Sequence, residues 1–175
     1  LSSKNGIELA TRKFCLKTRS DLLLKNNNFL DIYIRMLSGI DEQTYQVKEE
    51  IPLFLISNET TKNPIFYPAY LHFCDWFILS TTREMNNLFD LELLSKKQLT
   101  FSQEDIDLSI KKDNMPEIKW SAETYIWKEY LQKIYDFKML HEFDLSPEVI
   151  QVHNSFLKNQ LILLDHKRSG TMPLK

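Results

Sequence analysis

The alternation of apolar and polar positions is most regular in the last third of the chain. After Ser121, apolar side chains recur every three or four residues as far as Leu140, which predicts a helix with Ser121 as its N-cap. Ser146-Pro147-Glu148 combines a capping hydroxyl, a proline suited to the first helical position and an acid in the first turn. A second helix is therefore predicted from Pro147 towards Leu164, and residues 121–165 should form a C-terminal helical hairpin.

Helical spacing also occurs in three earlier segments. Ser20 and Asp21 form a plausible cap for a short helix that carries Leu22–Leu24. Residues 29–37 have apolar side chains at helical spacing and end before Ser38-Gly39, which is a typical helix stop. Residues 69–86 predict a third helix with a broad apolar face. Residues 106–110 alternate like a strand that follows a short helical turn.

A polar loop between two apolar runs predicts a β-hairpin in EIPLFLISNETTKNPIFYP, residues 50–68. The apolar runs cover residues 51–56 and 65–67. Pro52, Pro64 and Pro68 flank them, and proline cannot donate to a sheet ladder. We therefore expect this hairpin at the edge of a sheet, where a strand of another chain could add.

Together these elements predict a helix-dominated α+β fold, with four to five helices packed on a small, mostly antiparallel sheet. A length of 175 residues fits one domain over residues 1–175. Residues 1–20 are locally basic and could form an N-terminal extension. That bias fits the remnant of a targeting region, and it fits a solvated first helix as well.

Composition argues against several classes of function. The chain has only 3 glycines, and no G-x-G-x-x-G or G-x-x-x-x-G-K-[ST] motif occurs, so no nucleotide is expected. A net charge of −2 gives no general attraction to nucleic acid. No apolar run approaches the ~18 residues that a transmembrane helix needs. Two cysteines, Cys15 and Cys74, favour an intracellular, reducing compartment, and the basic N-terminus leaves a mitochondrion or plastid as an alternative.

Histidines, cysteines and acids do not form a recognised catalytic or metal-binding pattern. His141-Glu142 begins like the zinc motif HExxH, but position 145 is Leu. His72 and Asp75 could meet on one helix face, whereas His72 and Cys74 would point to different faces. We therefore predict no catalytic residue, no metal and no cofactor. Enzymatic activity is disfavoured, and an enzyme with a dispersed site is kept as an alternative.

Aromatic side chains are abundant, and Tyr and Trp often anchor protein interfaces. The leading functional prediction is a non-catalytic protein–protein interaction module or a subunit of a larger assembly. Its protein partner and its oligomeric state are left open. The candidate interface residues are Leu53, Phe54, Leu55, Phe66, Tyr67, Tyr70, Trp76, Trp120 and Trp127.

One stretch resembles a known family. The order of Ile51-Pro52-Leu53-Phe54, a loop, Pro64-Ile65-Phe66-Tyr67 and a following aromatic-rich helix is similar to units of the twenty-two-kilodalton plastid import factors of the Tic family. That resemblance implies a chaperone-like protein import or assembly factor of an organelle, which is a further alternative function.

Overall fold

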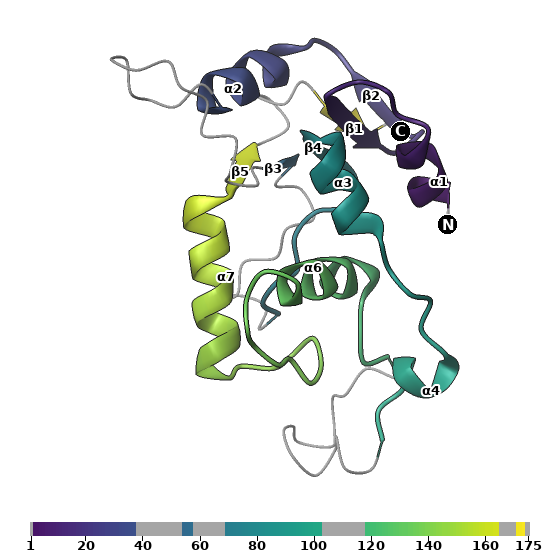
Figure 1. Cartoon of the computed structure of the whole chain (residues 1–175), viewed down its shortest axis with the longest axis vertical. Coiled ribbons are helices and arrows are strands. Elements are labelled where there is room, and N and C mark those ends of the chain that lie inside the picture. The colour runs from purple at the N-terminus through teal and green to yellow at the C-terminus, as the bar shows by residue number, and fades with distance from the viewer. Residues whose placement is uncertain (1, 38–53, 58–68, 103–117, 165–170, 174–175) are drawn as a thin grey trace. The chain divides into compact units, whose positions relative to one another are not determined.

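The computed structural model describes residues 2–37, 54–57, 69–102, 118–164 and 171–173 (Figure 1). These residues form an α+β fold with a small, mostly antiparallel sheet, which confirms the predicted fold class. In chain order the elements are α1 (Ser2–Glu8), β1 (Phe14–Thr18), β2 (Leu22–Leu24), α2 (Asn28–Leu37), β3 (Phe54–Ser57), β4 (Phe77–Thr81), α3 (Thr82–Phe89), α4 (Lys96–Leu99), α6 (Ala122–Gln132), α7 (Pro147–Asn159), β5 (Leu161–Leu164) and β6 (Thr171–Pro173).

Contacts between residues divide the chain into two compact units. The first unit comprises residues 1–61, 74–87 and 155–175, and the second comprises residues 62–73 and 88–154. Each unit therefore combines segments that are far apart in the sequence. One domain over residues 1–175 stays a prediction.

The first unit is built on a four-stranded sheet with the strand order β1-β4-β3-β5. Strand β4 pairs antiparallel with β1 on one side and with β3 on the other, and β3 pairs parallel with β5. Strands β2 and β6 form a separate antiparallel pair. Phe14–Thr18, which lies in the basic N-terminal stretch, is thus a strand of the main sheet.

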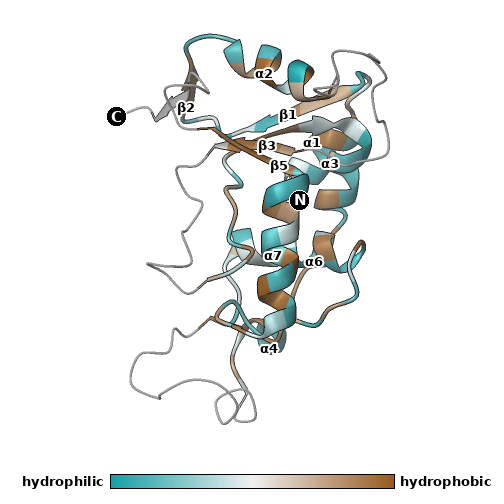
Figure 2. Cartoon of the chain, turned by 90° about the vertical axis from the view of Figure 1, so that its left-hand side faces the viewer, coloured by the Kyte–Doolittle hydropathy of each residue, from teal (hydrophilic) through white to brown (hydrophobic). Residues whose placement is uncertain are grey.

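The two interior strands are apolar on both faces, as interior strands usually are. In β3, Phe54, Leu55 and Ile56 are fully buried, and β3 and β5 are strongly hydrophobic (Figure 2). Leu55 packs on one face with Phe29 and Tyr33 of α2. Phe54 contacts the ring of Phe156, with ring centroids 6.1 Å apart. Packing on both faces fixes the register of β3 and β4, because a slip by one residue would reverse every side chain.

The prediction that residues 51–56 form an edge strand is wrong for the part that the structure describes. Strand β3 lies between β4 and β5 and has a neighbour on each side. Its three consecutive apolar residues, Phe54, Leu55 and Ile56, are all buried, which is possible on both faces of an interior strand. The burial of these side chains outweighs the preference of the flanking prolines for an edge. Residues 65–67 and Pro52, Pro64 and Pro68 lie outside the described residues.

Two predicted helices are not helical over most of their length. Leu22–Leu24 is β2, which pairs with β6 from the other end of the chain. Residues 69–76 are irregular and lead into strand β4, so the third helix, predicted over residues 69–86, begins only at Thr82. Short apolar runs have the same pattern in a buried helix and in a buried strand. Here the distant partner strands decide between the two.

Three of the predicted helices begin where the sequence predicts them. The helix predicted over residues 29–37 is α2, Asn28–Leu37. Ser121 caps α6 by accepting a hydrogen bond from the Thr124 N–H group, and α7 begins at Pro147. Their C-terminal ends are earlier than predicted: α6 ends at Gln132, and β5 begins at Leu161. Residues 106–110 lie outside the described residues.

Candidate functional site

The register of β1 and β4 brings polar side chains together at one end of the sheet. Thr18 at the end of β1 lies opposite Phe77 at the start of β4. The pairing continues one step further, because the Arg19 N–H group donates to the Trp76 carbonyl at 3.1 Å. Residues that directly follow β1 therefore lie beside residues that directly precede β4.

A tight turn between β1 and β2 holds Arg19 against Asp21. The Leu22 N–H group donates to the Arg19 carbonyl at 3.2 Å and closes the turn. Across it, Arg19 Nε and Nη2 donate to the two Asp21 carboxylate oxygens at 2.9 and 2.7 Å. These bidentate hydrogen bonds from Arg19 lower the pKa of Asp21. The two parallel hydrogen bonds thus set the relative orientation of the guanidinium and carboxylate groups.

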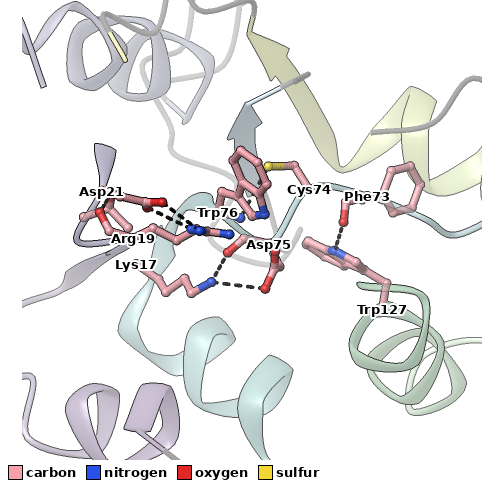
Figure 3. A network of polar contacts seen from close by, with 9 residues as sticks. Lys17, Arg19, Asp21, Phe73, Cys74, Asp75, Trp76 and Trp127 are labelled. Carbon is pink, nitrogen blue, oxygen red and sulfur yellow. Dashed lines mark hydrogen bonds and ion pairs between the residues drawn. The ribbon is translucent and has the colours of Figure 1, made fainter. Parts of the chain in front are cut away.

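The Trp76 ring supports the same guanidinium group. The guanidinium carbon of Arg19 lies 4.4 Å from the Trp76 ring centroid, which is a cation–π contact (Figure 3). Trp76 is partly buried, and its backbone N–H group donates to the Cys74 sulfur at 3.4 Å. Arg19 is therefore held by a carboxylate and by an aromatic ring at once.

Lys17 and Asp75 form a second ion pair beside the first. Lys17 Nζ lies 3.3 Å from Asp75 Oδ2, and it also donates to the Asp75 carbonyl. The side chain of Lys17 is 14% exposed and that of Asp75 is 22% exposed. Partial removal from water strengthens such a pair relative to one on the open surface.

We refer to Lys17, Arg19, Asp21, Asp75 and Trp76 as the charged cluster (Figure 3). It lies wholly in the first unit and joins two cations, two carboxylates and an aromatic ring. Such a set can both donate and accept hydrogen bonds, and it can pack against an apolar surface of a ligand. This combination is suited to a polar, hydroxyl-bearing molecule.

A second set of polar contacts fixes the backbone of the second unit. Leu71 has a positive φ of 57°, a conformation that costs a non-glycine residue roughly 1–2 kcal/mol. Its N–H group donates to His153 Nδ1 at 3.2 Å. His72 Nδ1 lies 3.1 Å from Ser121 Oγ and 3.2 Å from Thr124 Oγ1. Trp127 Nε1 donates to the Phe73 carbonyl at 3.1 Å (Figure 3), so side chains of two helices hold residues 71–73.

His153 is buried among rings and stays uncharged. Its ring stacks on Phe73 with centroids 5.0 Å apart and meets Tyr70 edge-on at 5.1 Å. Burial lowers the pKa of His153 to about 4. Because Nδ1 accepts a hydrogen bond from Leu71, the neutral ring carries its proton on Nε2.

A family model described as WavE lipopolysaccharide synthesis matches residues 1–172. The chain belongs to the WavE lipopolysaccharide synthesis family. No curated protein and no solved structure gives a significant match. The chaperone-like import or assembly factor considered from the sequence stays a prediction.

In this WavE family chain, His72 and Asp75 do not form the helical pair considered from the sequence. Residues 69–76 are irregular, so the spacing of one helix turn does not apply. His72 bonds to Ser121 and Thr124 in the second unit, whereas Asp75 pairs with Lys17 in the first. His141 is buried and accepts a hydrogen bond from the Phe143 N–H group at 3.2 Å.

The predicted interface residues lie in several environments. Phe54, Leu55 and Trp127 are completely buried, and Trp120 is 7% exposed. Tyr70 and Trp76 are partly buried. Leu53, Phe66 and Tyr67 lie outside the described residues. Of this set, Trp76 belongs to the charged cluster, and the interface as a whole stays a prediction.

Sequence reasoning missed Lys17, Arg19 and Asp21. The Arg19–Asp21 pair had a local signal, because polar residues between the apolar runs of β1 and β2 favour a turn. Lys17 and Asp75 are 58 positions apart, and only the pairing of β1 with β4 reveals their contact. Within the described residues, no group of three or more His, Cys, Asp or Glu could hold a metal ion. No helix there is long and apolar enough to span a bilayer.

The His153 contact predicts a specific dependence of stability on pH. The folded-state pKa of about 4 lies below the ordinary value of 6.5, so the unfolded chain binds a proton at a higher pH than the folded chain does. Stability from this residue is full above pH 6.5 and decreases as the pH falls towards 4. The expected loss is about 3 kcal/mol in the free energy of unfolding.

Urea unfolding at several pH values, followed by tryptophan fluorescence, measures this loss. Other groups also titrate in the range, so the matched variant is His153→Gln, which keeps a hydrogen-bond acceptor but does not titrate there. We expect the wild type to lose about 3 kcal/mol more than the variant between these pH values. An identical pH dependence of the two proteins would contradict a buried, neutral His153.

Proposed function

We propose that this chain binds carbohydrate during lipopolysaccharide synthesis, with the charged cluster as the binding site. Membership of the WavE family supports the process. The observation that supports the site is that Arg19 makes two contacts at once. It lies against the Trp76 ring, and it donates two hydrogen bonds to the Asp21 carboxylate. Side chains that are already held by such contacts lose less conformational entropy when they bind a ligand.

The chemistry of a sugar matches the groups in the charged cluster. A sugar ring presents hydroxyl groups at its edge, and each hydroxyl both donates and accepts hydrogen bonds. Carboxylates such as Asp75 accept these bonds, and Arg and Lys side chains donate them. The C–H groups of the sugar face can pack on the exposed part of an indole ring such as that of Trp76. Binding by these side chains requires no covalent bond to be made or broken.

Deletion of the gene in its host, followed by mass spectrometry of extracted lipopolysaccharide, tests this proposal. We expect a lipopolysaccharide that lacks one or more sugar units, and we expect a wild-type copy to restore it. The Arg19→Ala variant should fail to restore the wild-type lipopolysaccharide, because the substitution removes both the hydrogen bonds to Asp21 and the contact with Trp76.

The matched control is Lys133→Ala, which removes a cation that pairs with Asp90 in the second unit. It should restore the lipopolysaccharide fully, and immunoblots should show equal amounts of both variants. Unchanged lipopolysaccharide after gene deletion, or full restoration by Arg19→Ala, would contradict the proposal.

Exposed apolar side chains favour a second candidate, the protein–protein interaction module predicted from the sequence. Leu23 in β2 is 43% exposed, and Ile34 in α2 is 53% exposed. Both elements belong to the first unit, and apolar positions lie among the polar ones of α2 (Figure 2). The other exposed apolar residues of these two elements are Leu24, Leu30 and Met36. Where exposed apolar side chains form one contiguous patch, they are typical of surfaces that bind a protein.

Sedimentation velocity over a range of concentrations tests this second candidate. We expect the purified chain to self-associate, and we expect Leu23→Glu with Ile34→Glu to weaken association at least tenfold, because two charges would be buried at the contact. A wild type that sediments as a monomer at every concentration would contradict self-association through these residues.

A further inference from the structure

We propose that the charged cluster binds an uncharged sugar unit and that Asp21 and Asp75 exclude acidic or phosphorylated sugars. This inference rests on the proposed function, and it adds the class of sugar and the residues that select it. It follows from the way in which the four charges are arranged.

Each cation of the charged cluster already has a carboxylate partner. Arg19 donates to both oxygens of Asp21, and Lys17 lies 3.3 Å from Asp75 Oδ2. The four charged side chains sum to zero, two positive and two negative. A carboxylate or phosphate of a ligand would therefore meet no excess positive charge at this site.

The exposed acids add repulsion to this balance. The Asp21 side chain is 54% exposed and its partner Arg19 44%, and Asp75 is 22% exposed and its partner Lys17 14%, so in each pair the carboxylate is the more accessible group to an approaching anion. Asp21 is ionised at neutral pH, as an ordinary aspartate is, and the hydrogen bonds from Arg19 lower its pKa further. Like charges that are brought together in this way select against the wrong ligand.

The same carboxylates suit the hydroxyl groups of an uncharged sugar. An ionised carboxylate has about four acceptor positions on its two oxygens. Each Asp21 oxygen accepts one bond from Arg19, and Asp75 Oδ2 is paired with Lys17. Hydroxyls can donate to the remaining positions without separating either ion pair. An uncharged sugar thus adds hydrogen bonds, whereas an anionic one would compete with the acids for the cations.

Isothermal titration calorimetry with matched sugars tests the inference. The uncharged probes are the methyl α-glycosides of D-glucose, D-galactose and D-mannose, and the charged probes are D-glucuronic acid and D-glucose 1-phosphate. We expect at least one uncharged glycoside to bind the full chain at least tenfold more tightly than either charged sugar. Arg19→Ala should weaken that binding at least tenfold.

Asparagine variants test the role of the acids. Asp21→Asn removes the negative charge beside Arg19 and leaves the charged cluster with a net positive charge. We expect its affinity for glucose 1-phosphate to rise at least fivefold, with a smaller change for the uncharged glycoside. Asp75→Asn should act in the same direction through Lys17.

The matched control is Asp90→Asn, which changes the total charge equally but lies in the second unit beside Lys133. It should leave both affinities unchanged. Three results would overturn the inference: tighter binding of a charged sugar by the wild type, an equal gain in Asp90→Asn, or no binding of any of the sugars. The lipopolysaccharide of the deletion strain decides separately whether the proposed function fails.

Discussion

The antiparallel pairing of β1 with β4 is the constraint on which the proposed site depends. Because Thr18 lies opposite Phe77, the residues after β1 meet the residues before β4. Arg19 then bonds to the Trp76 backbone and lies over its ring, while Lys17 reaches Asp75. A shift by one residue would turn Lys17 to the opposite face of the sheet and separate it from Asp75.

Hydrophobic packing supports that register. Phe77, Ile78, Leu79 and Ser80 of β4 are buried, so the strand is anchored on both faces. The charged cluster lies where this buried strand begins, and its ion pairs keep contact with solvent. Rigid packing and accessible polar groups are thus combined within a few residues.

In the second unit, hydrogen bonds to side chains hold residues 71–73 and offset the strain of the positive φ at Leu71.

Features that depend on neighbouring residues were predictable from the sequence. The cap at Ser121 and the start of α7 at Pro147 need only a few adjacent residues, and both form as predicted. The α+β class also follows from local patterns. Strand β2 was predicted as a helix, because three leucines alone do not reveal that Thr171–Pro173 pairs with them. The Lys17–Asp75 pair depends on the register of two distant strands, which no local pattern contains.

The central claim is that the charged cluster binds an uncharged sugar, and the indole N–H signals of the three tryptophans test it directly. Trp76 belongs to the charged cluster, whereas Trp120 and Trp127 are buried residues of the second unit. In a two-dimensional ¹H–¹⁵N titration with the methyl glycosides, we expect the Trp76 signal to shift in a saturable manner. The Trp127 signal should stay in place, because its N–H group donates to the Phe73 carbonyl. A Trp76 signal that does not move at saturating glycoside would contradict the claim.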